Sequence, residues 1–261
     1  MAEVVANGVR LHVQRMGAPG PGRPTVVFVH GLVMDNLSSW YFTVAGAAAA
    51  RADVVLYDLR GHGRSERPSS GYGLADMVLD LDALLDALAI PGPVVLVGNS
   101  FGGLLALVFA IARTDRTAGL VLVDAHLGDE GFAEEMAATL SLEGEARDQR
   151  IVESFQSWAG RHSERKRNRL ADTARALVQG TSLVDDMRAT SPLSSVALRL
   201  VEAPVLALYG ERSDLRARGE ARLRPLPRCR VEIIPGCTHS VLWEATDVVR
   251  DRIVAFLDEL G

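Results

Sequence analysis

The stretch Gly98-Asn99-Ser100-Phe101-Gly102 constrains the fold more than any other part of the chain. An apolar run over residues 94–97 leads into it and predicts a buried strand, and a second run over 102–110 predicts a packed helix. A serine on a sharp turn from strand to helix is held in a strained backbone conformation, with its hydroxyl exposed at the edge of a sheet. Glycines on both sides leave room for this turn. The helix that follows directs its first N–H groups and its positive dipole end at the serine, where they can stabilise negative charge.

Composition limits the class of protein. A chain of 261 residues with 48% hydrophobic content can form one large α/β domain with a sizeable core. The net charge of −5 gives no basic field for nucleic acid, so we expect no nucleic-acid partner. Two cysteines, Cys229 and Cys237, do not make a disulfide framework and are interpreted as buried thiols. With no apolar leader and no apolar run near the ~20 residues that span a bilayer, we expect a cytoplasmic protein without membrane contact.

Strand and helix patterns alternate along the chain, which predicts a mostly parallel sheet covered by helices on both faces. Asn7-Gly8 between short apolar segments predicts a hairpin turn before this alternation begins. The predicted strands are Thr25–Val29, Val54–Tyr57, Val94–Val97, Gly119–Val123, Pro204–Tyr209 and Arg230–Ile234. Helical periodicity is found at Ala45–Ala50, Leu74–Leu88 and Val248–Leu260.

The alternation is interrupted between two strands. Residues 126–195 are charged, helical in pattern and without strand periodicity. We therefore predict a core made of residues 1–125 and 196–261, with residues 126–195 inserted as a helical lid (cap) over a site.

Three more clusters of polar residues follow the carboxyl ends of predicted strands, where open α/β sheets place their sites. They are His30-Gly31 with Leu32-Val33-Met34, the run from Tyr57-Asp58 to Arg64-Ser65, and Thr238-His239-Ser240. Together with the serine turn, and in this order, they resemble the α/β-hydrolases, in particular the lid-bearing esterases, thioesterases and carbon–carbon hydrolases. The resemblance covers essentially the whole chain and implies the α/β-hydrolase fold.

The resemblance implies a Ser-His-Asp triad. Ser100 is the predicted nucleophile, and it needs a base within hydrogen-bond reach because a serine hydroxyl is not ionised at neutral pH. His239 is the predicted base, since imidazole can both take and return a proton. A carboxylate must then orient the imidazole. Asp214, after the strand that ends at Tyr209, is the preferred acid, and Asp124 at the end of the preceding strand is the alternative.

The backbone N–H groups of Leu32 and Phe101 are predicted to form the oxyanion hole. Asp58, Arg60 and His62 are predicted to hold a turn, and His30 to position the neighbouring loop. The six histidines are scattered without paired ligand spacing, so we expect no metal and no cofactor.

Candidate substrate contacts come from the loops and the insertion: Val33, Phe132, Phe155, Trp158 and Trp243. The charged run Arg161–Arg169 is interpreted as a solvated helix face. Its alternative role is recognition of an anionic part of the substrate, such as the phosphopantetheine arm of a carrier protein.

The function implied by the resemblance is hydrolysis of an ester, thioester or lactone through an acyl-Ser100 intermediate, with a small-molecule acyl substrate that is free or carrier-bound. Carbon–carbon bond hydrolysis is an alternative, because Gly98–Gly103 is similar to the serine turn of ring-cleavage-product hydrolases. Against it, those enzymes carry a Gly/Ser/Pro-rich loop where this chain has Leu32-Val33-Met34-Asp35. An acyltransferase or cyclase is a further alternative, and a non-catalytic ligand receptor is the least favoured. Nothing in the sequence predicts an oligomeric state.

Overall fold

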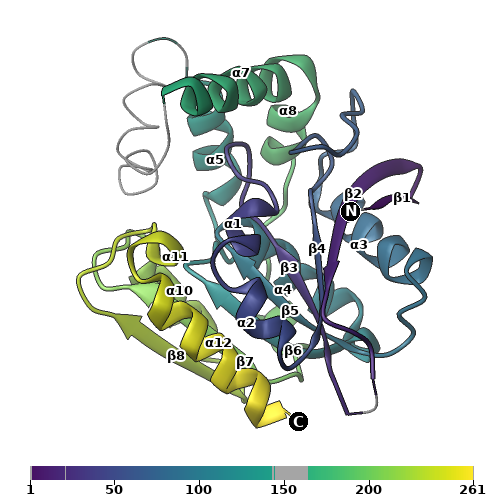
Figure 1. The fold of residues 1–261 in the computed structure, drawn as a ribbon. Helices are drawn as coiled ribbons and strands as arrows, with labels where there is room; N and C mark the ends of the chain where they lie inside the picture. Colours follow the sequence, from purple (N-terminus) through teal and green to yellow (C-terminus); the bar gives the residue numbers. More distant parts are fainter. Residues whose placement is uncertain (1, 21, 143, 145–163, 261) are drawn as a thin grey trace.

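The computed structural model describes residues 2–20, 22–142, 144 and 164–260. Over these residues an eight-stranded sheet runs through the centre of the protein in the order β1-β2-β4-β3-β5-β6-β7-β8 (Figure 1). The six strands from β4 to β8 in this order are parallel, and β1 and β2 join the edge next to β4 in antiparallel pairing. The strands are β1 Ala2–Ala6, β2 Val9–Met16, β3 Thr25–Val29, β4 Asp53–Tyr57, β5 Val94–Asn99, β6 Thr117–Val123, β7 Val205–Gly210 and β8 Cys229–Ile234.

The predicted hairpin turn joins β1 to β2. Asn7 has a φ of 49° and Gly8 a φ of 75°. Two consecutive positive φ values are what a two-residue hairpin requires, and Asn-Gly adopts them at low cost. The hairpin prediction is confirmed.

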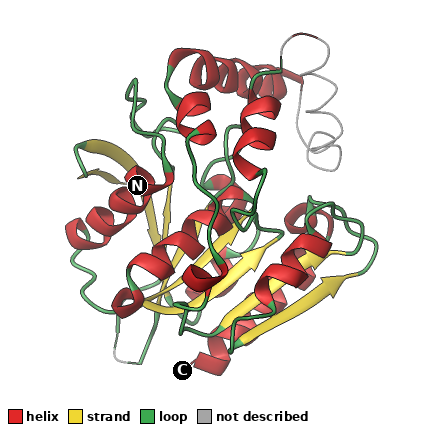
Figure 2. Cartoon of the chain, turned by 180° about the vertical axis from the view of Figure 1, so that it is seen from behind, coloured by secondary structure: helices red, strands yellow, loops and turns green. Residues whose placement is uncertain are grey.

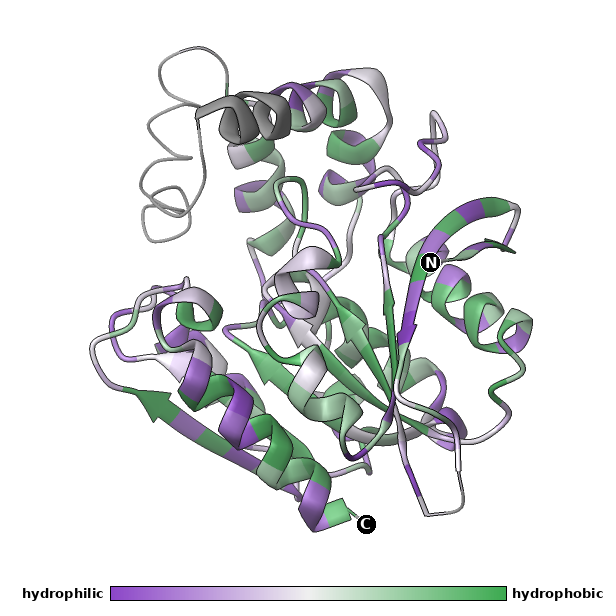
Figure 3. Ribbon diagram, in the orientation of Figure 1, coloured by the Kyte–Doolittle hydropathy of each residue, from purple (hydrophilic) through white to green (hydrophobic). Residues whose placement is uncertain are grey.

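Alternating residues of the strands face two separate cores. Val27 and Val29 of β3 belong to a cluster with helices α3 (Leu74–Ala87) and α4 (Phe101–Ala112). Val26 and Phe28 belong to a cluster with helices α2 (Ala45–Ala49) and α12 (Thr246–Leu260). This alternation follows from the pleat of a strand. Both faces of the parallel sheet are therefore covered, as predicted (Figures 1 and 2). The central strands are largely apolar, whereas the edge strand β8 carries Arg230 and Glu232 (Figure 3). The helices outside the insertion are α1 Ser38–Tyr41, α2 Ala45–Ala49, α3 Leu74–Ala87, α4 Phe101–Ala112, α10 Arg216–Leu223, α11 Val241–Glu244 and α12 Thr246–Leu260, with a 3₁₀ turn at Thr114–Arg116.

The chain between β6 and β7 carries helices and, among its described residues, no strand. Its helices are α5 Phe132–Leu140, α7 Glu164–Gly180, α8 Leu183–Arg188 and α9 Ser195–Leu198. Helices α5, α7 and α8 gather beyond the carboxyl ends of the parallel strands (Figure 1). At the base of this segment the Leu193 N–H donates to the Gly128 carbonyl oxygen at 2.7 Å, which ties its outgoing and returning ends together. Whether residues 126–195 act as a lid stays a prediction.

The turn after β4 is fixed by buried charge. Arg60 donates to both carboxylate oxygens of Asp80 on α3, at 2.6 and 2.5 Å, and both side chains are buried. The carboxylate of Asp58 accepts from the backbone N–H of Leu37 at 2.8 Å and of Arg64 at 2.9 Å. Asp58 and Arg60 therefore hold the turn, as predicted. Among the described residues no helix is both long and apolar enough to cross a bilayer.

Replacing Asp80 with Asn should destabilise the fold strongly, because it leaves the Arg60 guanidinium buried without a countercharge. We expect a loss of about 3–5 kcal/mol in the free energy of unfolding, measured by urea denaturation. Asp258→Asn is the matched control, since the Asp258–Arg51 pair is exposed and its loss should cost less than about 1 kcal/mol. Equal, small losses in both variants would contradict the structural role of the buried pair.

Candidate active site

Ser100 lies on the turn between β5 and α4 with a φ of 52° and a ψ of −122°. A positive φ is strained for a residue with a side chain and costs on the order of 1–3 kcal/mol. Close packing holds it there: a Cβ on Gly98 would overlap the backbone of Gly102, and one on Gly102 would overlap the carbonyl groups of Val29 and His30. The predicted turn geometry around Ser100 is therefore present.

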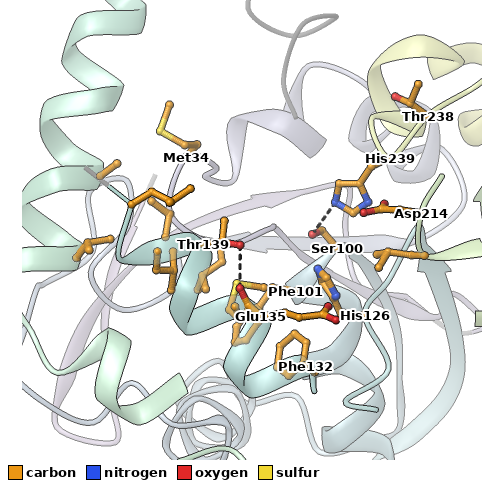
Figure 4. Close-up of a pocket in the computed structure, with 18 of the residues that line it drawn as sticks. Met34, Ser100, Phe101, His126, Phe132, Glu135, Thr139, Asp214, Thr238 and His239 are labelled. Atoms are coloured by element: carbon orange, nitrogen blue, oxygen red, sulfur yellow. Dashed lines mark hydrogen bonds between the residues drawn. The ribbon is translucent and has the colours of Figure 1, made fainter. Parts of the chain in front are cut away.

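His239 lies between a hydroxyl and a carboxylate. Its Nε2 is 3.1 Å from Ser100 Oγ, and its Nδ1 is 2.9 Å from Asp124 Oδ1 (Figure 4 draws the first contact). With Nδ1–H donating to the carboxylate, Nε2 is free to accept the serine proton. Ser100, His239 and Asp124 thus form one hydrogen-bonded chain, although they come from three different loops at the carboxyl edge of the sheet.

Asp124 is held in place by further hydrogen bonds. Its side chain is 2% exposed. Gly210 N–H donates to its Oδ2 at 2.7 Å, and the Ser213 hydroxyl donates to its Oδ1 at 2.5 Å. These donors stabilise the charge of a carboxylate that is out of contact with water.

The carboxylate on His239 is therefore Asp124, and not Asp214, which the sequence favoured. Asp214 is exposed, lies four residues beyond the end of β7, and makes no hydrogen bond to His239. The physical reason is position: Asp124 directly follows β6, the strand next to β5, whereas the loop after β7 brings the Ser213 hydroxyl, not the Asp214 carboxylate, to this point. Asp214 still lines the pocket in front of Ser100 (Figure 4).

The two predicted oxyanion-hole donors, Leu32 and Phe101, belong to residues of the pocket that contains Ser100. Neither the Leu32 nor the Phe101 backbone N–H has a hydrogen-bond acceptor among the described residues, and both residues line the same pocket as Ser100. Phe101 is the first residue of α4, so its N–H has no partner within the helix. Two unpaired N–H groups beside a nucleophile can bind a developing oxyanion.

The loop that carries Leu32 is held in a tight γ-turn. Val33 has a φ of 65°, and Met34 N–H donates back to the Leu32 carbonyl oxygen at 2.8 Å. Val33 N–H in turn donates to Nε2 of His62 at 2.8 Å. The turn after β4 therefore positions this loop through a histidine.

Two buried histidines, His30 and His62, hydrogen-bond to the backbone of the loops next to the reaction centre. His62 Nδ1 contacts the Arg60 carbonyl oxygen at 2.8 Å, so Nδ1 carries the proton and Nε2 accepts from Val33. His30 is arranged in the same way between the Gly31 carbonyl oxygen and the Leu59 N–H, at 2.7 and 3.0 Å. Burial, together with the neighbouring His30, lowers the pKa of His62 to about 3. Both residues position loops, as predicted.

A pocket of about 410 Å³ opens in front of Ser100 and His239. Its walls come from the Leu32 loop and from helices α5, α7 and α10. Half of the lining side chains are apolar, namely Leu32, Val33, Met34, Phe101, Phe132, Met136, Leu140, Leu142, Ala174, Val178 and Leu215. Its charged side chains are Glu135, Arg175, Arg212, Asp214 and Arg218.

The predicted substrate contacts have different outcomes. Val33 and Phe132 line this pocket. Trp243 lines a second, smaller cavity of about 60 Å³ that also touches Ser100 and His239. Phe155 and Trp158 lie outside the described residues, and so do residues 161–163 of the charged run. The side chains of the rest of this run are not described either.

Among the pocket residues that sequence reasoning missed, His126 lies beside His239. It follows Asp124 by two residues, and its ring centroid is 5.9 Å from that of His239. The signal was available, because His126 belongs to the polar residues just beyond the carboxyl end of a strand. Among the described residues no group of three or more His, Cys, Asp or Glu side chains could hold a metal ion.

Comparison with known proteins identifies the relatives of this chain. Residues 26–252 match the profile of the alpha/beta hydrolase family. Over 123 residues the chain is 39% identical to Lipase LipV of Mycobacterium tuberculosis, covering 47% of this chain and 44% of the lipase. Over 125 residues it is 38% identical to 2-hydroxy-6-oxo-2,4-heptadienoate hydrolase of Pseudomonas putida, covering 47% of this chain and 43% of that enzyme. The matches thus span less than half the length of these curated relatives.

A likeness to solved structures extends over the whole chain. The enol-lactonase of Burkholderia xenovorans superposes with a TM-score of 0.78, covering 98% of this chain and 100% of the lactonase. At 23% sequence identity this comparison concerns the fold alone.

The buried His62 should make the protein less stable in acid. Between its folded pKa of about 3 and the ordinary value of 6.5, the unfolded chain binds a proton that the folded protein excludes. The free energy of unfolding should therefore fall as the pH drops from 6.5 toward 3, and His62→Gln, which cannot titrate, should flatten this slope by up to about 1.4 kcal/mol per pH unit. Urea denaturation at a series of pH values measures the slope, and an unchanged slope would show that His62 is not the responsible group.

Proposed function

Because this chain belongs to the alpha/beta hydrolase family, we propose that it is a serine hydrolase that cleaves an ester, thioester or lactone through an acyl-Ser100 intermediate. The observation that carries the proposal is the hydrogen-bonded chain Ser100–His239–Asp124 at the head of a largely apolar pocket. The pocket supports a small-molecule substrate with an apolar acyl part.

Acylation begins when Ser100 Oγ attacks the carbonyl carbon of the substrate. The hydroxyl proton passes to His239 Nε2, and the Leu32 and Phe101 N–H groups stabilise the oxyanion that forms. When the tetrahedral intermediate collapses, the bond to the leaving alcohol or thiol breaks. His239 returns its proton to that group, and the acyl group remains on Ser100.

Deacylation repeats these steps with water. His239 takes a proton from the attacking water, the same N–H groups stabilise the second oxyanion, and the carboxylic acid leaves as Ser100 regains its proton. Throughout, the Asp124 carboxylate keeps the His239 proton on Nδ1 and stabilises the imidazolium. Asp124 is well suited to this role, because Gly210 and Ser213 fix its orientation.

Carbon–carbon bond hydrolysis is the second candidate reaction. It is supported by the identity to the heptadienoate hydrolase and by the sequence Gly98-Asn99-Ser100-Phe101-Gly102-Gly103. The apolar side chains of Leu32, Val33 and Met34 stand against it. Transfer of the acyl group to an alcohol or amine remains the third candidate, and added acceptors that compete with water would reveal it.

The proposal is tested first with a fluorophosphonate probe. Intact-protein mass spectrometry should give a single adduct, and peptide mapping should locate it on Ser100. Ser100→Ala should take up no probe and should lose at least about 10³-fold in kcat on p-nitrophenyl acyl esters. A folded wild-type protein that takes no probe, or an alanine variant that retains most of its rate, would refute the assignment of Ser100.

The choice of acid is tested by two isosteric variants. Asp124→Asn should lower kcat by about 10⁴-fold, because the amide favours the wrong tautomer of His239. Asp214→Asn should have an effect at least about 100-fold smaller, since its carboxylate does not contact the imidazole. Circular dichroism and thermal melting establish that both variants fold. The reverse ranking of kcat would assign the acid to Asp214.

A further inference from the structure

His126 stands at the reaction centre without a role in the proposed mechanism. Its backbone N–H donates to the Ser100 carbonyl oxygen at 3.3 Å, which ties its position to that of the nucleophile. Its ring packs at 5.1 Å, between centroids, from the ring of Phe132 on α5. In the close-up the ring lies between Ser100 and Phe132 in the pocket wall (Figure 4).

The ring nitrogens of His126 have no hydrogen-bond partner among the described residues, in contrast to His30 and His62. In both of those histidines each ring nitrogen is bonded to the backbone. His126 is only partly buried, and its side chain lines the pocket. The hydrogen-bonding capacity of the ring is therefore left for whatever occupies the pocket.

The His126 imidazole is neutral at the pH of the reaction. Burial, with a further contribution from His239, lowers its pKa to about 3, although Asp214 and Asp129 act in the opposite direction. A neutral imidazole offers one N–H donor and one nitrogen acceptor. It can therefore bind a hydroxyl group through either nitrogen, or a carbonyl or ether oxygen through its N–H.

The charges around His126 favour a neutral oxygen over a carboxylate. Asp214 and Glu135 line the same pocket. The guanidinium of Arg218 is shared between Asp129 and Glu135, both at 3.2 Å. Of the two remaining arginines of the wall, Arg175 is paired to Asp172 and Arg212 donates to the Gly236 carbonyl oxygen, and neither is among the charges that act on His126.

We propose that His126 hydrogen-bonds a second, uncharged oxygen of the substrate, so that the natural substrate is an oxygen-bearing acyl compound, such as a hydroxyacyl or ketoacyl ester or thioester or a substituted lactone. His126 is then a positioning and specificity residue: it orients the acyl chain while Ser100, His239 and the two N–H donors carry out the chemistry. The inference rests on the proposed hydrolase function and narrows its substrate class.

The test compares thioesters of equal chain length that differ in one oxygen. N-acetylcysteamine thioesters of hexanoate and of its hydroxy and keto derivatives, substituted at successive carbons, are assayed with the wild-type protein. For at least one position we expect kcat/KM to exceed that of the plain hexanoyl thioester by about tenfold, the size of one neutral hydrogen bond. The preference should appear mainly in KM, because the contact orients the substrate.

Two variants at the same position separate hydrogen bonding from packing. His126→Phe keeps a ring but removes both nitrogens, and it should lower kcat/KM for the preferred oxygenated substrate about tenfold more than for the hexanoyl thioester. His126→Gln, which restores a donor and an acceptor, should recover part of the preference. Val178→Ala, on the α7 wall of the same pocket, is the matched control, and it should change both substrates by a similar factor, because it alters only the apolar wall.

The outcomes distinguish the two proposals. A wild-type protein that hydrolyses all the thioesters without preference, or a His126→Phe variant that slows every substrate equally, overturns the role of His126 and leaves the hydrolase function standing. A wild-type protein that hydrolyses none of them and takes no fluorophosphonate on Ser100 overturns both proposals.

Discussion

Helix α4 approaches strands β3 and β5 more closely than side chains would permit, and the position of Ser100 depends on this contact. Gly98 and Gly102 stand at the two points of closest approach, where a Cβ atom would overlap the neighbouring backbone. The helix that follows is buried along most of its length, so its packing offsets the cost of a serine with positive φ. A larger residue at either glycine would move the helix away from the sheet and the nucleophile with it.

The other residues of the site are positioned by backbone hydrogen bonds between neighbouring strands at the carboxyl edge of the sheet. Ser100 N–H bonds to the carbonyl oxygen of Val123 on β6, and Asp124 N–H bonds to that of Leu208 on β7. Asp124 itself has a φ of 43°, so two strained residues stand side by side, each anchored on the next strand. The His126 N–H, which bonds back to the Ser100 carbonyl oxygen, closes the series. The distances within the Ser-His-Asp chain are therefore set by sheet geometry more than by the loops alone.

Local patterns in the sequence predicted most of the sheet, because buried parallel strands are apolar throughout and Asn-Gly has few alternatives to a tight turn. The serine turn and the histidine that meets it were also predicted from the residues. The acid was not: Asp124 and Asp214 follow neighbouring strands, and the choice between them depends on the path of the loop after β7. There Ser213 donates to Asp124 while Asp214 stays exposed, a difference of one residue that no periodicity encodes. His126 also follows a strand end in the sequence, but its unpaired nitrogens become visible only once its neighbours are in place.

The hydrogen bond between Gly128 and Leu193 also bears on how such a protein can diversify. It holds the two ends of the inserted segment together, so β6 and β7 can stay paired whatever chain lies between these ends. The entropy of closing a loop grows only with the logarithm of its length, and doubling the length costs roughly 0.6 kcal/mol. Helices could therefore be gained, lost or exchanged within this segment over evolutionary time at little expense to the sheet, which would allow new substrate ranges to arise on an unchanged reaction centre.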